Sequence, residues 1–261
     1  MLIQTLFLSI VQSITEFLPV SSSGHFILTR LIMGWEEQGA AMDIALHVGT
    51  LLAVCVYFFK DLWRMLIDLF KGGAGRRMIY LLLVATFPVL LVGFFYGRYI
   101  EMVFRNPYIV CVMLIVFGVI LWLADKYSAS DNQVKKMSTL DALFIGLAQC
   151  LAFIPGVSRS GITMTMARFR KINRSDAAYF TMLLSIPVIA AAGCWVFLSL
   201  LIHDQLNVLG AAFVEGIIFS FVGGLAVIWF LMNFVKKHSF FAFMVYRIIL
   251  AIIVLIFLFF K

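Results

Sequence analysis

The chain has 261 residues, of which 64% are hydrophobic and only 13% are charged, and its formal net charge is +7 at pH 7. Soluble domains carry about 25% charged residues, so this composition excludes an ordinary soluble enzyme and indicates an integral membrane protein. The excess of positive charge does not indicate nucleic-acid binding, because the basic residues follow apolar segments, as they do in loops beside membrane spans.

The first apolar segment covers residues 3–31 and is interrupted at its middle by a polar run from Pro19 to His25, which reads Pro-Val-Ser-Ser-Ser-Gly-His. Proline removes an amide donor and clashes with the preceding helical turn, and the serines and glycine after it favour a loop and the start of a new helix. We therefore expect a re-entrant helix–loop–helix hairpin here, with a single kinked span as the alternative. No basic stretch precedes the segment, so a cleavable signal peptide is not expected.

Six further apolar segments are uninterrupted and close to the ~20 residues that cross the hydrocarbon core of a bilayer. They cover residues 40–59, 79–97, 107–124, 177–201, 209–231 and 241–260. Between the third and the fourth, residues 141–168 form another apolar segment, which is broken at its middle by the run from Pro155 to Gly161. The expected fold class is an all-α integral membrane protein with about six transmembrane helices plus two re-entrant helix–loop–helix hairpins.

Basic residues gather on one side of this predicted topology. They are Lys60, Arg64, Lys71, Arg76, Arg77, Lys126, Lys135, Lys136, Arg168, Arg170, Lys171, Arg174, Lys236 and Lys237. The opposite side carries only Arg30, Arg98, Arg105 and the terminal Lys261. The positive-inside rule makes the richer side cytoplasmic and places both termini outside.

The two polar runs repeat each other. Gln149 lies 137 residues after Gln12, and the same offset places Val-Ser-x-Ser-Gly on Val-Ser-x-Ser-Gly. Because three spans, an odd number, separate the hairpins, the second half is inserted upside down relative to the first. We predict one membrane domain, residues 1–261, built from inverted-topology repeats, approximately 1–124 and 138–261, whose hairpin loops meet tip to tip. Such repeats are known in transporters, so they do not by themselves indicate an enzyme.

The first polar run offers the groups of an anion site. Three serines and Gly24 ahead of a new helix supply hydroxyls and amide donors, and the helix dipole favours an anion there. His25 lies in the first turn of that helix and suits proton transfer. Glu16 lies one turn from Gln12, and a carboxylate at membrane depth is costly and usually functional. The alternatives are a paired charge for Glu16 and helix capping for His25 and the serines.

The second polar run places Arg159 between Ser158 and Ser160, with Thr163 one turn further on. A guanidinium in a membrane requires an anionic partner, and its planar fork matches a phosphate. The alternative partner is Glu16, as a structural ion pair. Together the two runs supply a cation clamp, anion-binding amides, a hydroxyl nucleophile, a carboxylate and a histidine, which suit phosphoryl transfer.

Other polar residues of the apolar segments have two interpretations each. Asp43 and His47 lie four residues apart at the start of the first span, where they line the cavity or sit at the interface. Arg247 in the last span is expected either to snorkel or to pair with Glu215. Residues 61–68 carry several charges and are interpreted as a solvated loop.

At these residues the chain resembles the undecaprenyl-pyrophosphate phosphatase family, also known as bacitracin-resistance proteins. Residues 12–16 and 19–25 are similar to that family's Glu/Gln-x-x-x-Glu followed by Pro-Val-Ser-Ser-x-Gly-His. Residues 155–163 are similar to its Pro-Gly-x-Ser-Arg-Ser-x-x-Thr, and residues 184–187, Leu-Ser-Ile-Pro, also look like the family. The similarity covers essentially the whole chain.

The resemblance implies a hydrolase of the bacterial inner membrane that converts undecaprenyl diphosphate, the spent lipid carrier of cell-wall synthesis, to undecaprenyl phosphate and inorganic phosphate. It also implies dependence on a divalent cation, Mg²⁺ or Ca²⁺, held at Glu16, and competition by bacitracin for the lipid substrate; a homodimer is left open. By motif position, the implied catalytic residues are Glu16, Ser22, His25 and Arg159. The implied substrate-binding residues are Gln12, Ser21, Ser23, Gly24, Ser158, Ser160, Gly161 and Thr163.

Three functions therefore compete at this point. The first is a lipid diphosphatase, in which Ser22 attacks the terminal phosphorus or positions a water that does. The second is a transporter or flippase for a lipid phosphate or a small anion, which needs the anion clamp but no nucleophile. The third is a structural membrane subunit, which needs no buried charges in both repeats. Because a neutral amide binds a hard cation less well than a carboxylate, position 12 favours a hydrogen bond to phosphate or water.

Overall fold

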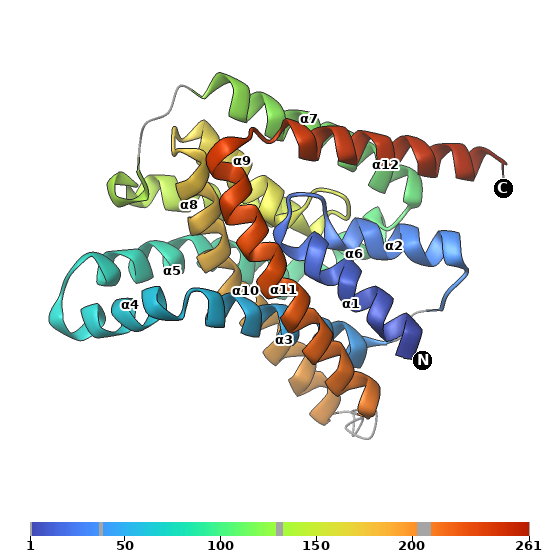
Figure 1. Ribbon diagram of the computed structural model, residues 1–261, viewed down its shortest axis with the longest axis horizontal. Coiled ribbons are helices and arrows are strands. Elements are labelled where there is room, and N and C mark those ends of the chain that lie inside the picture. The colour runs from blue at the N-terminus through green and yellow to red at the C-terminus, as the bar shows by residue number, and fades with distance from the viewer. Residues whose placement is uncertain (1, 37–38, 129–132, 203–209, 261) are drawn as a thin grey trace.

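The computed structural model describes residues 2–36, 39–128, 133–202 and 210–260, and the regular structure within these ranges is helical (Figure 1). The α-helices are α1 (Leu2–Phe17), α2 (Ser22–Met33), α3 (Ala40–Tyr57), α4 (Phe59–Lys71), α5 (Ala74–Val92), α6 (Arg98–Phe104), α7 (Pro107–Tyr127), α8 (Thr139–Gln149), α9 (Arg159–Phe169), α10 (Arg174–Ile202), α11 (Ala211–Lys237) and α12 (Phe241–Phe260). A π-helical turn η1 (Gly93–Gly97) and the 3-10 turns η2 (Val134–Lys136) and η3 (Cys150–Phe153) join them. Lys261 and the first residue of the span expected at 209–231 lie outside the described residues.

The helices confirm a multi-pass membrane protein. Within the described ranges, five helical stretches are long and apolar enough to span a bilayer: Ala74–Gly97, α7, α10, α11 and α12. A sixth is formed if α3 and α4, which meet at a bend of 73°, count as one broken span. Large apolar side chains such as Phe87 and Trp229 are more than 60% exposed, as expected for surfaces that face lipid.

The interpretation of residues 61–68 as a solvated loop was wrong, because these residues lie in α4. Met65 is buried on one face of this helix, and the Asp68 carboxylate accepts a hydrogen bond from the Gly75 amide at 2.8 Å. That bond supports the first turn of α5. Charged residues are compatible with a loop or with the outer face of an amphipathic helix, and the periodic apolar residues between them favour the helix.

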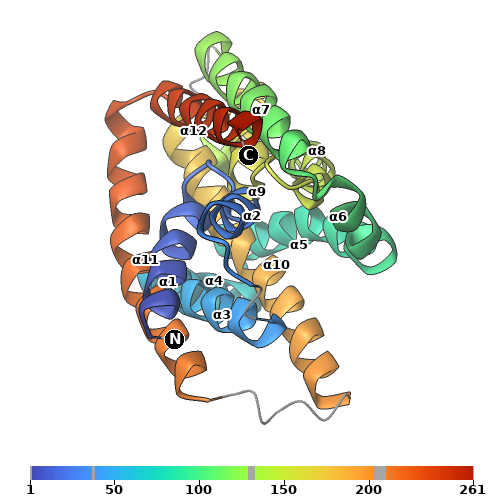
Figure 2. The same ribbon diagram turned by 90° about the vertical axis from the view of Figure 1, so that its right-hand side faces the viewer.

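Each polar run separates two short helices. The first lies between α1 and α2, and the second lies between η3 and α9. The stretches Leu2–Phe17 and Thr139–Phe153 are apolar but shorter than the transmembrane helices. At 1.5 Å per residue, a helix of 16 residues is about 24 Å long and does not cross ~30 Å of hydrocarbon. Two views at right angles place the loop between α1 and α2 at the centre of the molecule, near α9 (Figures 1 and 2).

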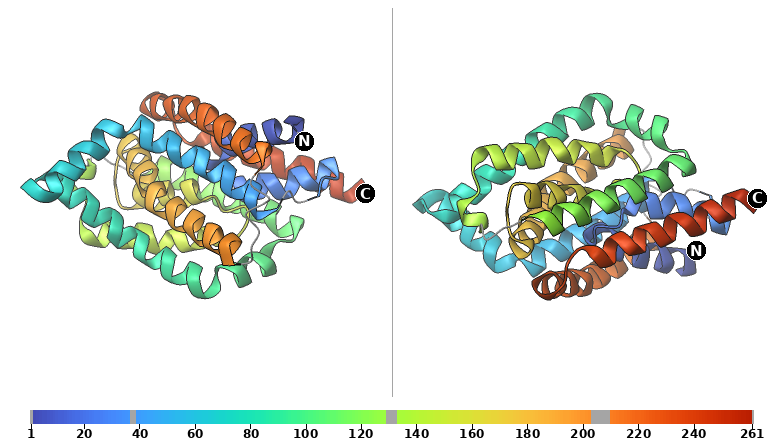
Figure 3. Two further views of the ribbon diagram at one scale, coloured as in Figure 1. Left: turned by 90° about the horizontal axis from the view of Figure 1, so that it is seen from below. Right: turned by 90° about the horizontal axis from the view of Figure 1, so that it is seen from above.

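The offset of 137 residues extends from the motifs to the helix boundaries. It relates the first residues of α1 and α8, of α2 and α9, and of α5 and α11. After the first polar run the longer helices are α2, α3, α4, α5 and α7, and after the second they are α9, α10, α11 and α12. The single helix α10 stands in the second half where the bent pair α3 and α4 stands in the first. Helices α7 and α12, which begin 134 residues apart and are the last helices of the two halves, pack side by side (Figure 3).

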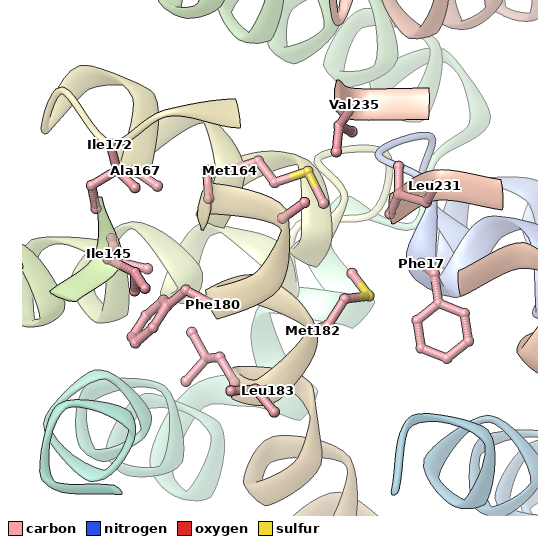
Figure 4. Close-up of a cluster of buried hydrophobic side chains, with 14 of the residues drawn as sticks. Phe17, Ile145, Met164, Ala167, Ile172, Phe180, Met182, Leu183, Leu231 and Val235 are labelled. Atoms are coloured by element: carbon pink, nitrogen blue, oxygen red, sulfur yellow. The ribbon is translucent and has the colours of Figure 1, made fainter. Parts of the chain in front are cut away.

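Helix α10 is the centre of the hydrophobic core. Its residues Phe180, Met182 and Leu183 are fully buried, and α9 and α11 add Met164 and Leu231 (Figure 4). The core reaches Phe17 at the end of α1, directly before the first polar loop. Buried packing on both sides therefore supports the two loops, and the polar residues between them are held on a rigid base.

Candidate active site

The two polar loops have the same backbone conformation. Ser21 and Ser158 are the residues before α2 and α9, and both have a φ of 76°. Each serine hydroxyl accepts a hydrogen bond from the amide three residues later, from Gly24 at 3.3 Å and from Gly161 at 3.1 Å. A left-handed conformation costs a residue other than glycine about 1–3 kcal/mol and persists only where the surroundings enforce it. Because their hydroxyls accept these amide hydrogens, Ser21 and Ser158 are the N-caps of α2 and α9. For Ser21 this is the helix-capping alternative that the sequence left open.

The second loop packs tightly onto α7 through Gly156. This residue has a φ of 96°, and a Cβ atom at this position would lie 2.6 Å from the carbonyl oxygen of Val110. Only glycine adopts this conformation without strain and also leaves room for the neighbouring backbone. The Pro-Gly step of the motif thus fixes the distance between the loop and α7.

Glu16 joins the two loops. Its Oε1 accepts a hydrogen bond from Nη2 of Arg159 at 2.8 Å, and its Oε2 accepts from Oγ of Ser22 at 3.3 Å. Ser22 and Arg159 are the first residues of α2 and α9. The Glu16 side chain is only 7% exposed, so its charge is stable there only because it is paired. The expected approach of Glu16, Ser22 and Arg159 is present in the structure.

Gln12 and His47 complete this side of the site. Nε2 of Gln12 donates to Oε2 of Glu16 at 3.2 Å and lies 2.7 Å from Nδ1 of His47. Of the two interpretations of His47, the structure supports the lining of the site. Asp43 lies apart from it in the first turn of α3, where its carboxylate is 3.6 Å from Nη2 of Arg30 and half exposed.

The remaining serines and Thr163 surround this centre at different depths. Ser160 donates from Oγ to the carbonyl of Leu18 at 3.0 Å, which ties the second loop to the first. Thr163 is fully buried behind Arg159: its hydroxyl donates to the Arg159 carbonyl and accepts from Thr181. The exposed Ser23 has its Oγ 3.4 Å from that of Ser21, and the Ser158 and Ser160 hydroxyl oxygens are 3.2 Å apart.

His25 does not contact Ser22 in the described hydrogen-bond network. Its Nδ1 lies 2.7 Å from the Ser21 carbonyl oxygen, and its Nε2 lies 2.7 Å from Oη of Tyr246. Tyr246 lies 221 residues away on α12 and was not among the residues that the sequence indicated for the site. No local sequence signal could have indicated this contact, because a tyrosine in an apolar span is also an ordinary core residue.

Both interpretations of Arg247 were wrong. This side chain is fully buried, so it does not snorkel, and its guanidinium binds backbone carbonyls instead of Glu215. It donates to Pro19 in the first loop, to Gly156 in the second loop and to Leu114 in α7, at 3.3, 2.7 and 2.9 Å. Further bonds reach the carbonyls of Met113 and Val157. Loops that break helices leave carbonyls without amide partners, and a guanidinium with five donors satisfies several of them.

The side-chain oxygens of Glu16 and Gln12 fit the ligands that a hard divalent cation prefers. Within the described residues there is no cluster of three His, Cys, Asp or Glu side chains. However, Oε1 of Gln12 is buried and has no hydrogen-bond partner in the described part of the chain, and it lies one helical turn from the Glu16 carboxylate. Mg²⁺ is commonly held by one or two carboxylates together with the phosphates of a substrate, so this oxygen set suits such an ion.

The arrangement can bind an anion and activate a hydroxyl. The first turn of a helix has amides without intrahelical partners and a positive dipole end, and two such turns meet here beside a guanidinium. Ser22 lies within hydrogen-bond distance of a carboxylate that can accept its proton, which is the geometry of an activated nucleophile.

Comparison with known proteins supplies independent findings. Residues 5–253 match the family described as "Bacitracin resistance protein BacA". The chain is 44% identical over 252 residues to the undecaprenyl-diphosphatase of Desulforudis audaxviator, with 95% of each chain covered. It is 40% identical over 254 residues to that of Saccharophagus degradans, with 95% of each covered, and 41% identical over 267 residues to that of Teredinibacter turnerae, with 98% of each covered.

Proposed function

The chain belongs to the bacitracin resistance protein BacA family, and from this premise we propose how its two loops carry out the reaction. The protein is a membrane-embedded undecaprenyl-diphosphatase, which hydrolyses undecaprenyl diphosphate to undecaprenyl phosphate and inorganic phosphate and so recycles the lipid carrier for cell-wall synthesis. One observation carries the proposed mechanism: a single carboxylate, Glu16, hydrogen-bonds the first residue of both α2 and α9.

In this proposal the diphosphate binds where the two helices begin. Arg159 binds the terminal phosphate through its guanidinium fork, and the first amides of α2 and α9 bind further phosphate oxygens. The exposed Ser23 hydroxyl would add a further donor. The Ser160 hydroxyl and the amides of Gly24 and Gly161, which bind Leu18, Ser21 and Ser158 in the structure, would hold the two loops in place around the phosphate. In the structure, Glu16 satisfies Arg159 at 2.8 Å, so the guanidinium is already oriented before an anionic ligand arrives.

We assign the attacking oxygen to Ser22. Its Oγ forms a bond to the terminal phosphorus while its proton passes to Glu16, and the bond between that phosphorus and the bridging oxygen breaks. Undecaprenyl phosphate leaves, and water then hydrolyses the phosphoserine to release inorganic phosphate. Glu16, and not His25, acts as the base in this scheme, because Glu16 hydrogen-bonds Ser22. An alternative route keeps Ser22 as a donor that orients an attacking water.

A divalent cation, Mg²⁺ or Ca²⁺, would be held chiefly by Glu16. The sequence favoured a hydrogen bond for Gln12, but its Nε2 already contacts Glu16 and His47, so only its Oε1 remains and would act as a weaker second ligand. When bound, such an ion neutralises the charge that develops on the diphosphate. The unpaired Gln12 oxygen beside the Glu16 carboxylate supports this assignment. We also propose that bacitracin competes with the enzyme for its lipid substrate.

We further propose that each polar loop is the tip of a re-entrant hairpin in an inverted-topology repeat, with both termini outside the bacterial inner membrane. The shared offset of the helix starts, the short helices that flank each loop and the contacts between the loops support this arrangement. The distribution of Lys and Arg over the predicted loops supports the orientation.

A transporter or flippase is the second candidate, because broken helices that surround an anion clamp also occur in transporters. The hydrogen bond between Ser22 and Glu16 favours the hydrolase, since transport needs no activated hydroxyl. Phosphate release from undecaprenyl diphosphate by the purified protein in detergent, with and without a chelator, tests the proposal. Turnover that stops with the chelator and returns with Mg²⁺ or Ca²⁺ is expected. Lipid binding without phosphate release would favour the transporter.

A further inference from the structure

Tyr246 of α12 lies directly against His25 of α2. The hydroxyl oxygen is 2.7 Å from Nε2, and the two rings are nearly parallel, at 3° and with centroids 5.7 Å apart. His25 is 9% exposed and Tyr246 is 46% exposed. Tyrosine thus covers the histidine from the outer side and holds one of its two ring nitrogens.

The hydrogen bonds determine which nitrogen carries the hydrogen. Nδ1 lies 2.7 Å from the carbonyl oxygen of Ser21, which can only accept, so Nδ1 is the donor. In the neutral ring Nε2 is then an acceptor, and it receives the hydroxyl hydrogen of Tyr246. Both ring nitrogens are therefore used within the protein, and neither is left to exchange a proton with Ser22.

The series of hydrogen bonds from Tyr246 through His25 ends at Ser21, whose backbone is strained. Ser21 has a φ of 76°, and its carbonyl accepts from His25 twice, from the backbone amide at 3.1 Å and from the ring at 2.7 Å. Ser21 directly precedes Ser22, so its conformation sets the direction in which the Ser22 hydroxyl points. The corresponding Ser158 has the same φ although Ile162 stands in place of His25. There Arg247 binds the carbonyls of the two preceding residues, Gly156 and Val157, at 2.7 and 3.2 Å, whereas in the first loop it binds the Pro19 carbonyl at 3.3 Å. The second loop thus has a support from Arg247 that the first loop replaces with His25.

Resting on the proposed function, we propose that Tyr246 and His25 are positioning residues for the diphosphatase reaction. Tyr246 holds the imidazole, the imidazole holds the Ser21 carbonyl, and Ser21 is thereby kept in the left-handed conformation that presents Ser22 to the phosphate. The Tyr246 hydroxyl donates to Nε2, and Nδ1 donates to the Ser21 carbonyl. Neither hydrogen bond has to give up its proton during turnover.

The substitutions His25→Asn and His25→Ala separate positioning from proton transfer. The asparagine amide is about as far from the backbone as Nδ1 and can donate to the Ser21 carbonyl, but it cannot take up a proton. We expect His25→Asn to stay within about tenfold of the wild-type kcat, and His25→Ala to lose about 10- to 100-fold, which corresponds to the cost of an unsupported strained residue. An asparagine variant as inactive as the alanine variant would overturn the proposal and make His25 a proton carrier.

A second variant tests the strain itself and works by restoring activity. Glycine adopts a positive φ without strain and is nearly as good an N-cap as serine. In the background of His25→Ala, the further change Ser21→Gly should therefore raise kcat severalfold. No recovery, in protein that still binds lipid diphosphate, would contradict the inference.

Tyr246→Phe removes only the hydroxyl and keeps the stacked ring. We expect kcat to fall about three- to tenfold, the factor that one ordinary hydrogen bond corresponds to, with little change in KM. The matched control is Tyr108→Phe, at an exposed tyrosine near the start of α7, which should leave kcat unchanged. A wild-type kcat for Tyr246→Phe would sink the role of Tyr246. The proposed function fails separately, if the wild-type protein releases no phosphate.

Discussion

The loop before α2 and the loop before α9 share a backbone conformation and differ in chemistry. Each has a serine at a φ of 76° that caps the following helix. At the 137-residue offset, however, Glu16 of the first half corresponds to Phe153 of the second, and Ser22 corresponds to Arg159. The duplicated feature is therefore a serine-capped helix start, to which the proposed mechanism assigns anion binding. In that mechanism the carboxylate and the attacking hydroxyl come from one copy, and the guanidinium comes from the other.

Helix α12 stabilises both loops by different means. Tyr246 holds the first loop through the His25 side chain, and the adjacent Arg247 binds carbonyls of both loops directly. A helix from the end of the chain thus fixes loops that are formed near the start and in the middle of the sequence. This arrangement explains why a fully buried arginine needs no carboxylate partner: the carbonyl dipoles of two broken helices surround its charge.

The largest expected loss of activity follows from removing the Ser22 hydroxyl of the first loop, which is the proposed nucleophile. Ser22→Ala should reduce phosphate release to background, because a covalent nucleophile has no substitute. Binding of the lipid diphosphate should persist, since Arg159 and the helix amides remain. Steady-state phosphate release and direct lipid binding check the two halves of this expectation. Substantial hydrolysis would instead identify an activated water as the attacking group.

A smaller loss of activity is expected when Arg159, the guanidinium of the second loop, is replaced by another positively charged side chain. Arg159→Lys replaces a planar fork with a point charge that cannot bind a phosphate through two parallel hydrogen bonds. We expect kcat/KM to fall about 100-fold, since each hydrogen bond to a charged group is worth about 1.5–3 kcal/mol. The matched control is Arg170→Lys, at an arginine that is 39% exposed and pairs with Asp141, where turnover should not change. Near-normal activity of Arg159→Lys would mean that Arg159 only pairs with Glu16.

The sequence predicted the membrane class, five of the six expected spans to within about six residues and the approach of Glu16, Ser22 and Arg159, because these depend on composition, apolar length and local motifs. The segment expected at 40–59 is α3, which is long enough to span a bilayer only together with α4. It did not predict α4, since charged residues on an amphipathic helix look like those of a loop. It also missed the contacts of Tyr246 and Arg247. Their partners are a histidine 221 residues away and backbone carbonyls, which any residue type supplies. Contacts of this kind depend on how distant helices pack.

The two glutamines at the start of the repeated motif give a prediction about stability. Gln12 has Glu16 and His47 as partners, whereas the positions that correspond to them in the second half hold Phe153 and Leu184. Both side-chain polar atoms of the buried Gln149 lack a hydrogen-bond partner in the described part of the chain.

Gln149→Met keeps the shape of the side chain and removes its unsatisfied polar atoms. We expect the variant to be more stable by about 1 kcal/mol, because a buried donor or acceptor without a partner costs about 1–3 kcal/mol. Thermal unfolding in detergent measures this difference, and activity should not change. A lower melting temperature would show that the Gln149 amide has a partner of its own. Gln12→Met is the matched comparison and should lower activity, since it removes the donor to Glu16.

The smallest effect is expected from Gln12→Glu, because the family motif that the chain resembles has either residue at this position. The new carboxylate lies beside Glu16, where two like charges repel unless a cation lies between them. A hard cation prefers carboxylate to amide oxygen, so we expect turnover within a few-fold of wild type and a lower Mg²⁺ or Ca²⁺ concentration for half-maximal activity. Titration of chelator-treated, metal-free enzyme with each ion measures this shift.

Gln149→Glu is the control for this prediction. It should leave the cation dependence unchanged and lower the melting temperature, because it buries a carboxylate away from the site. If Gln12→Glu instead abolishes turnover in folded protein, then residue 12 faces neither the cation nor the phosphate, and the comparison of the two glutamines loses its functional meaning.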